Sequence, residues 1–286
     1  MKLINYFYLF FTAGLWGSSF LMIKYSLQEL SEFDIALYRI LLPAIMLNIL
    51  NRDKVHILKE DYKYFLILGI TYMTVPFYLF ALAEKTITSA LAGLINGSTP
   101  IFVALIAIFF YKEKVTVLQK ILIATGFVGV VVLSTGSQGI IYGSSKGILY
   151  ALVASICYGI SINMIQPLLK KYTPIGTLKI LLRSASLFSI LLLGPFSTWT
   201  IPSFSVSLFP LLLLGIGSSG LAFLTFYKLI DDVGAVPSSV TVNIIPIFSI
   251  LFGYFFLQEM TSVTQLIGVS IIVISAIFFT RIKVST

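Results

Sequence analysis

Long apolar runs separated by short polar stretches recur along the whole 286-residue chain. A helix needs about 20 residues to cross a hydrocarbon core of about 30 Å, and runs near this length with few charges are typical of membrane spans. We find ten such runs, at residues 4–26, 34–50, 63–83, 87–111, 116–134, 147–169, 174–195, 207–229, 233–257 and 261–280. The pattern predicts an all-α integral membrane protein with ten transmembrane helices.

The composition agrees with this pattern, because 58% of the residues are apolar, 10% are charged and the mean hydropathy is +1.02. A soluble domain is about one quarter charged, so a soluble enzyme or a secreted domain is excluded. The single cysteine, Cys157, excludes a disulfide framework and a cysteine-based metal site. The sequence indicates no cofactor, no metal and no nucleic-acid partner.

Basic residues fall mainly on one side of the predicted helices. If the N-terminus is cytoplasmic, 13 of the 19 Lys and Arg residues lie in cytoplasmic segments and three, Lys24, Lys85 and Lys146, lie outside. Cytoplasmic loops of membrane proteins carry an excess of Lys and Arg. Both termini are therefore predicted to be cytoplasmic, in a multi-pass protein of the cell (inner) membrane of a bacterium.

The chain matches itself at a spacing of about 146 residues. The matching pairs are Leu68-Gly69-Ile70 with Leu214-Gly215-Ile216, Pro100-Ile101-Phe102 with Pro246-Ile247-Phe248, Glu113 with Glu259, Gln119 with Gln265, Arg39 with Arg183, and Gly17 with Gly159. They predict two five-helix repeats, residues 1–140 and 141–286. Because five is odd, the second repeat enters the membrane inverted, as in many secondary transporters. A duplication that only builds a stable bundle is the alternative.

The segment Trp16-Gly17-Ser18-Ser19-Phe20, and the stretch from Ala81 to Gln119, resemble the EamA-type transporters of the drug/metabolite transporter superfamily. The resemblance covers essentially the whole chain. It implies export or exchange of amino acids, nucleosides, cofactors or drugs. It also implies a central cavity surrounded by the first, third, fourth, sixth, eighth and ninth helices, with the fifth and tenth at the periphery.

Polar side chains inside membrane spans are costly, so they are the first candidates for a binding site. The candidate substrate-binding residues are Trp16, Ser19, Tyr78, Asn96, Tyr158, Asn163, Tyr227 and Asn243. The indole of Trp16 either lines a cavity or only packs helices together. Asn96 and Asn243 precede prolines, and a proline frees a backbone carbonyl one turn earlier. Each amide therefore either satisfies that carbonyl or binds a ligand.

A second group has predicted gating or structural roles: Gly93, Gly97, Pro100, Pro246, Arg39, Arg183, Glu113 and Glu259. Gly93 and Gly97 form a G-x-x-x-G step, which favours close helix packing over bending. Arg39 and Arg183 are expected to donate hydrogen bonds to the exposed carbonyls of neighbouring helix ends. If they face the cavity instead, they indicate a substrate with a carboxylate or phosphate. The two glutamates are expected to cap or tether neighbouring helices.

No carboxylate or histidine lies in the middle of a predicted span, since Glu84, Glu113 and Glu259 are at span ends and His56 is in a loop. Proton-driven carriers normally need such a group, so exchange or facilitated transport is favoured. The predicted spans also lack the residue pairs that intramembrane enzymes use, so we predict that the protein is not an enzyme.

The sequence predicts a secondary transporter that moves small organic metabolites, such as amino acids or similar zwitterions and anions, by alternating access. Its partners are the substrate and membrane lipid, and a monomer is compatible with the sequence. The alternatives are a non-transporting scaffold or receptor and a proton-coupled drug or metabolite exporter of the same fold. Residue chemistry alone leaves both open.

Overall fold

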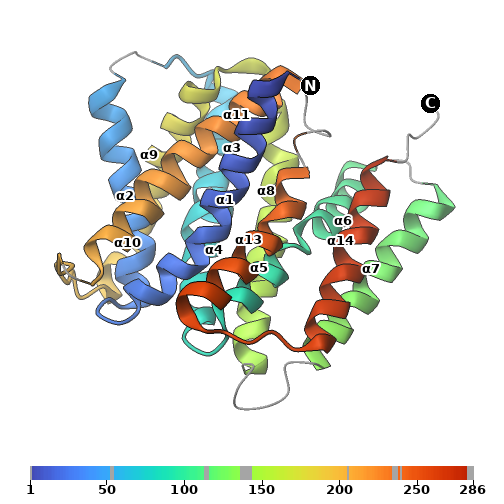
Figure 1. Cartoon of the computed structure of the whole chain (residues 1–286). Helices are drawn as coiled ribbons and strands as arrows, with labels where there is room; N and C mark the ends of the chain where they lie inside the picture. Colours follow the sequence, from blue (N-terminus) through green and yellow to red (C-terminus); the bar gives the residue numbers. More distant parts are fainter. Residues whose placement is uncertain are drawn as a thin grey trace.

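The computed structural model describes residues 2–51, 55–112, 116–135, 144–204, 206–233, 238 and 240–281. This described part of the chain is helical and has no β-strand (Figure 1). Its elements, in chain order, are α1 (Leu3–Ser26), α2 (Glu32–Leu50), η1 (Lys59–Asp61), α3 (Tyr62–Leu68), η2 (Gly69–Thr74), α4 (Val75–Glu84), α5 (Ser89–Asn96), α6 (Thr99–Tyr111), α7 (Val117–Thr135), α8 (Ser145–Lys171), α9 (Pro174–Leu192), η3 (Gly194–Phe196), α10 (Leu208–Leu212), η4 (Leu213–Leu221), α11 (Ala222–Val233), α13 (Val240–Leu257) and α14 (Val263–Arg281).

Seven helical stretches of the described chain are long and apolar enough to cross a membrane. They are Leu3–Ser26, Glu32–Leu50, Lys59–Glu84, Ser89–Tyr111, Ser145–Lys171, Pro174–Leu192 and Leu208–Val233. Shorter apolar helices cover Val117–Gly129, Thr241–Leu257 and Val263–Ser275. Length and composition therefore confirm a multi-pass helical membrane protein.

One predicted span is interrupted in the structure. The predicted helix at residues 87–111 is divided into α5 and α6 at Gly97 and Ser98. Pro100 explains the break, because it has no backbone N–H and disfavours the helical conformation of the residue before it. Of the predicted span at residues 233–257, Val233 is the last residue of α11, α13 covers Val240–Leu257, and residues 234–237 and 239 lie outside the described residues.

The two halves of the chain are interlocked by close contacts of their first helices. A Cβ atom on Gly17 would overlap that of Phe248, and one on Gly159 would lie 2.8 Å from that of Phe102. The backbone of α1 thus lies directly against α13, and that of α8 against α6. Phe102 and Phe248 are themselves matched in the sequence repeat. Figure 1 shows α1 and α8 running in opposite directions.

A π-helical turn occurs in each half at the matched Leu-Gly-Ile sequence. In η2 a Cβ on Gly69 would lie 2.9 Å from the backbone nitrogen of Ala185 in α9. In η4 a Cβ on Gly215 would lie 3.0 Å from Cβ of Leu42 in α2. Both glycines therefore allow a close approach between a π-helical turn and a helix of the other half. Such turns are frequent at functional sites.

Helices α7 and α14 pack against each other at one side of the bundle (Figure 1). Both begin with the same cap, in which Gln119 accepts a bond from the backbone of Thr116 at 2.9 Å and Gln265 accepts one from the backbone of Ser262 at 3.0 Å. These capping boxes explain why the two glutamines match in the sequence repeat.

Candidate functional site

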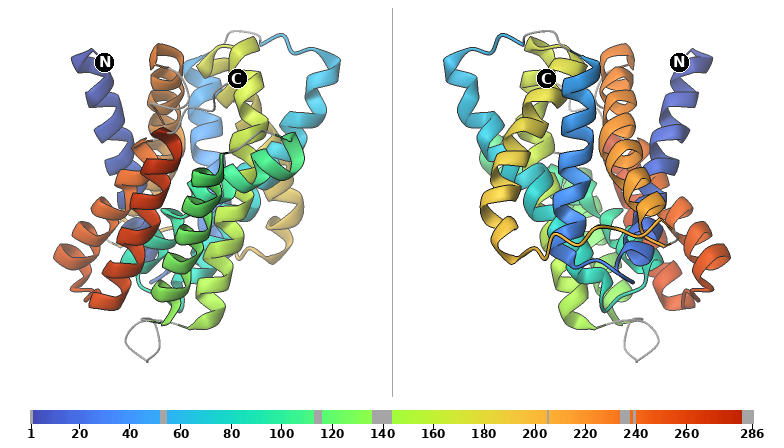
Figure 2. Two further views of the ribbon diagram at one scale, coloured as in Figure 1. Left: turned by 90° about the vertical axis from the view of Figure 1, so that its right-hand side faces the viewer. Right: turned by 90° about the vertical axis from the view of Figure 1, so that its left-hand side faces the viewer.

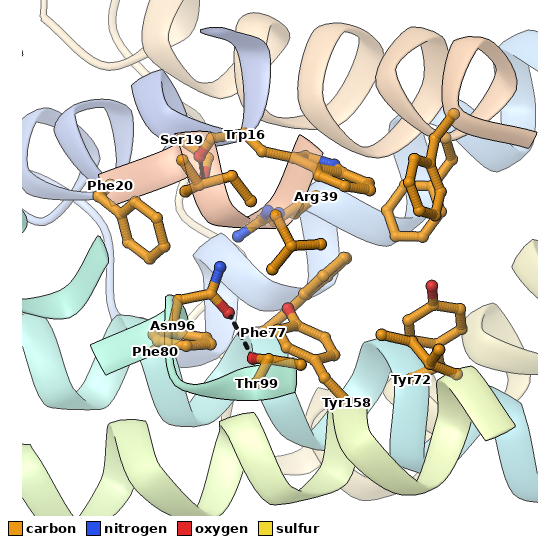
Figure 3. A pocket seen from close by; sticks show the side chains of 15 residues that line it. Trp16, Ser19, Phe20, Arg39, Tyr72, Phe77, Phe80, Asn96, Thr99 and Tyr158 are labelled. Carbon is orange, nitrogen blue, oxygen red and sulfur yellow. Dashed lines mark hydrogen bonds between the residues drawn. The ribbon is translucent and has the colours of Figure 1, made fainter. Parts of the chain in front are cut away.

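Helices of both halves surround a cavity of about 60 Å³ (Figure 3). It is lined by Trp16, Ser19, Phe20, Arg39, Tyr72, Phe77, Phe80, Asn96, Thr99, Tyr158, Ile162, Phe223, Phe226, Val242 and Ile245. Aromatic rings with a few convergent polar groups are typical of small-molecule sites. The volume has room for only a few water molecules, so the walls must move apart to admit a metabolite. Neither α7 nor α14 contributes a lining residue.

The side chain of Trp16 both lines the cavity and fixes its wall. Its indole Nε1 donates a hydrogen bond to the carbonyl of Ser218 in η4 at 3.1 Å. Its ring packs against Phe223 and Phe226, with ring centroids 5.4 and 4.9 Å apart. Next to it, the Ser19 hydroxyl donates to the Trp16 carbonyl at 2.6 Å. The side chain of Trp16 therefore both packs helices together and lines the cavity.

Arg39 supplies the cationic group of the cavity. Its guanidinium lies 3.9 Å from the ring centre of Phe77, and its Nε donates to the Ser219 hydroxyl at 3.0 Å. The residue is only 5% exposed, and no carboxylate of the described chain lies within ion-pair distance of it. A buried charge without a counter-charge is costly. The arrangement is therefore suited to an anionic group brought by a ligand.

Asn96 and Thr99 face Arg39 across the cavity. The Thr99 hydroxyl donates to Oδ1 of Asn96 at 3.3 Å, and Figure 3 shows the amide nitrogen of Asn96 directed toward Arg39. Beside them, the ring of Tyr158 stacks on Phe80 at 5.9 Å and meets Tyr72 edge-on at 6.0 Å. The amide of Asn96 is thus free to contact a ligand while its oxygen holds Thr99.

Four predicted binding residues lie outside the lining. Tyr78 stacks on Phe33 at 4.9 Å, and Tyr227 is buried next to Phe223 at 5.9 Å. The amide of Asn163 donates to the carbonyl of Gly159 within α8 at 2.9 Å and to that of Val103 at 3.0 Å, and the second bond joins α8 to α6. Asn243 is buried, and its amide has no hydrogen-bond partner among the described residues.

The predicted packing role of the glycines agrees with their surroundings. A Cβ on Gly93 would overlap Ser249 of α13, and one on Gly97 would lie 2.6 Å from Cγ of Pro246. Pro246 lies inside α13, whereas Pro100 is the second residue of α6. At these two points, α5 and the turn after it approach α13 through small residues and one proline.

The remaining charged candidates have separate environments. The carboxylate of Glu259 accepts hydrogen bonds from the backbone nitrogens of Ser89 and Ala90, both at 2.9 Å, and so caps the start of α5. Its repeat partner Glu113 lies outside the described residues. Arg183 is exposed and donates to Oδ1 of Asn48 at 2.6 and 3.0 Å, away from the cavity.

Thr99 and Ser219 were not among the site residues predicted from the sequence. Thr99 could have been found because it lies one helical turn after Asn96. Ser219 gave no such signal, since its role depends on a π-helical turn that turns it toward Arg39 of another helix.

A polytopic helical bundle with a closed, mostly aromatic cavity at the junction of its two halves is the architecture of membrane carriers. The EamA-like transporter family matches the chain twice, at residues 3–135 and 145–281, and the chain belongs to this family. It is therefore a multi-pass membrane transporter.

Relatives agree with this assignment. The chain is 28% identical over 273 residues to an uncharacterized transporter of Archaeoglobus fulgidus, covering 94% of this chain and 96% of that protein. It is 24% identical over 284 residues to the uncharacterized transporter YdfC of Bacillus subtilis, covering 95% and 89%. A solved crystal structure at 20% identity superposes over 96% of both chains with a TM-score of 0.66, which supports the fold.

Proposed function

We propose that the protein is a secondary transporter of small organic metabolites that carry a carboxylate, such as amino acids or similar zwitterions and anions. The observation that supports this most is Arg39, a cavity-lining guanidinium that is 5% exposed and has no ion-pair partner among the described residues. A guanidinium binds a carboxylate with two parallel hydrogen bonds.

The other lining groups suit the rest of such a substrate. The amide of Asn96 lies opposite Arg39 and can donate to the same carboxylate (Figure 3). The faces of Trp16 and Tyr158 can accept an ammonium group or pack against an apolar side chain. We propose these three residues, together with Ser19, as substrate contacts. Asn243, with its unpartnered amide, becomes a further contact when the helices move.

For the mechanism we propose alternating access by two inverted five-helix repeats, residues 1–140 and 141–286, with ten spans and cytoplasmic termini. The matched contacts of Gly17 with Phe248 and of Gly159 with Phe102 support this, because each joins the first helix of one repeat to the fourth of the other. Two copies in opposite orientation can form inward-open and outward-open states of similar energy. Exchange or facilitated transport fits the cavity, because its described lining residues include no carboxylate or histidine.

The test is counterflow in proteoliposomes that are preloaded with a panel of amino acids and other organic acids. We expect saturable exchange of one carboxylate-bearing class. In Arg39→Gln the apparent affinity should fall at least about 30-fold, since removing one partner of a buried charge pair costs about 2–5 kcal/mol. Arg183→Gln is the matched control, because Arg183 is exposed and away from the cavity, and it should exchange like the wild type.

Two results would count against the proposal. Exchange of neutral or cationic compounds only, unchanged in Arg39→Gln, would refute the carboxylate class. Absence of flux for every compound of the panel, with folded protein in the vesicles, would favour a non-transporting receptor or scaffold instead.

A further inference from the structure

Glu84 is the last residue of α4 and lies outside the substrate cavity. Its position at a span end predicts a carboxylate near the surface, but the side chain is 0% exposed. Neither of its carboxylate oxygens has a hydrogen-bond partner in the described structure. An ionised carboxylate without donors or a counter-ion is far too costly to bury. The geometry therefore requires a ligand on this group, and a proton is the smallest.

The groups around Glu84 leave its carboxylate unpaired although cations are near. Lys24 of α1 is the nearest base, but its Nζ donates to the backbone carbonyl of Glu84 at 2.5 Å and forms no ion pair with the carboxylate. Burial disfavours the charged form of Glu84 most, and the charges of Lys24, then Glu259 after α13, then Arg39 of α2 also act on it. From α8, Tyr158 stacks on Phe80 of α4 and Tyr150 lies near Tyr78, while α5 has no titratable residue.

A polar cavity of about 440 Å³ adjoins Glu84 at the end of the bundle where α1 ends and α2 begins. It is lined by Lys24, Leu27, Gln28, Leu30, Ser31, Glu32, Glu84 and Lys85. Glu32 is paired with Lys85 at 3.0 Å, and the Lys85 side chain is 49% exposed. The cavity therefore brings solvent close to Glu84. Among the described residues no group of three His, Cys, Asp or Glu side chains could hold a metal ion, which favours a proton as the ligand.

We propose that Glu84 is a proton-binding site, that it holds a proton while the bundle is closed at this end, and that it releases the proton when the polar cavity opens to water. The inference rests on the proposed transport function and adds to it. Cargo binds at Arg39, and the proton binds at Glu84. Because Arg39 lies within electrostatic range of both, the charge on Glu84 can influence the affinity for an anionic substrate. Proton coupling then needs no carboxylate in the cavity itself.

The first test is infrared spectroscopy of the purified full-length protein in lipid vesicles, which detects the carbonyl stretch of a protonated carboxylic acid. We expect this band at neutral pH in the wild type, its loss in Glu84→Gln, and its return at a shifted position in Glu84→Asp. Glu32→Gln is the matched control, because Glu32 lines the same cavity but is paired with Lys85, and it should retain the band. A wild type without the band, or a Glu84→Gln variant that keeps it, would overturn the proposal.

The second test uses proteoliposomes with the same panel of organic acids. An imposed pH gradient should raise uptake several-fold in the wild type and should have no effect in Glu84→Gln, while counterflow without a gradient stays within about twofold. Uptake that ignores the gradient in the wild type, or still responds to it in Glu84→Gln, would refute the coupling. If no compound moves at all, the proposed transport function fails, and the infrared result still decides whether Glu84 binds a proton.

Discussion

At the scale of single residues, Arg39 and Arg183 occupy matching sequence positions but have different environments. Arg39 is buried on the cavity wall with Ser219 and Phe77, whereas Arg183 is exposed and bound to Asn48. The repeat preserves the residue type, and the local surroundings decide its role. Two asparagines differ in the same way, since Asn96 faces the cavity and Asn163 joins two helices.

This difference between Asn96 and Asn163 predicts different effects of their substitution by alanine. Asn96→Ala should lower transport about tenfold, as expected for the loss of one hydrogen bond of about 1.4 kcal/mol to a charged substrate, and should cost little stability beyond the 3.3 Å bond from Thr99. Asn163→Ala should leave substrate affinity unchanged and cost about 0.6–1.5 kcal/mol of stability, because it removes the bond to Val103 that joins α8 to α6. Counterflow and thermal unfolding in detergent measure the two effects. The interpretation is wrong if Asn163→Ala changes affinity more than Asn96→Ala does.

At the scale of helices, the approach of α5 to α13 depends on Gly93. Gly93→Ala should destabilise the protein by about 1–3 kcal/mol, because the new methyl group overlaps Ser249. Adding Ser249→Gly should restore most of the loss by making room for it. Gly14→Ala is the control, since its Cβ would meet Phe248 at an ordinary 3.8 Å, and it should be neutral or stabilising. Thermal unfolding of the three variants checks this, and failure of the double variant to recover would refute the contact.

The connection after α9 is held to the bundle by hydrogen bonds with side chains of α2 and of the loop before α2. Figure 2 shows this segment crossing in front of α2, where the Tyr38 hydroxyl donates to the carbonyl of Thr200 at 3.1 Å. In the loop between α1 and α2, Glu29 accepts a bond from the Ser203 backbone nitrogen at 3.1 Å and bonds from the Ser203 and Ser207 hydroxyls. The hydroxyl of Ser203, and then that of Ser207, lower the pKa of Glu29 below its ordinary value of 4.5.

Because the pKa of Glu29 is lowered, its hydrogen bonds contribute fully to stability at pH values above the ordinary carboxyl pKa. They are lost as the pH falls through the lowered pKa. We expect the protection of the Ser203 amide against hydrogen exchange to be constant from neutral pH to about 5 and to fall in more acidic solution. Glu29→Gln should show weaker protection that does not depend on pH. Exchange followed by mass spectrometry, corrected for intrinsic rates, measures this. Equal pH profiles in both proteins would contradict the role of Glu29.

At the scale of the whole molecule, the helices were predictable because they depend on residue spacing and hydrophobicity, which the sequence carries directly, whereas the two inverted repeats stay a prediction. Trp16, Ser19, Asn96 and Tyr158 were found as cavity residues by their polarity within spans. The burial of Glu84 and the pairing of Arg39 with Ser219 were not predictable, because they depend on π-helical turns and on contacts between distant helices. Polarity within a span therefore indicates a candidate binding residue. Only the packing shows whether its side chain faces the cavity or joins two helices.

The proposed orientation of the whole bundle can be tested with single cysteines. Glu60 and Met260 are exposed at opposite ends, with 69% and 65% of their surface accessible, and Cys157 can be replaced by serine to give a background without cysteine. Because the sequence predicts that the end of the bundle where α1 begins carries most of the Lys and Arg residues, this end should stay in the cytoplasm. A membrane-impermeant thiol reagent should then label Met260→Cys in intact bacterial cells and label Glu60→Cys only after permeabilisation. The reverse pattern would invert the orientation, and labelling of both in intact cells would contradict a spanning bundle with opposite ends.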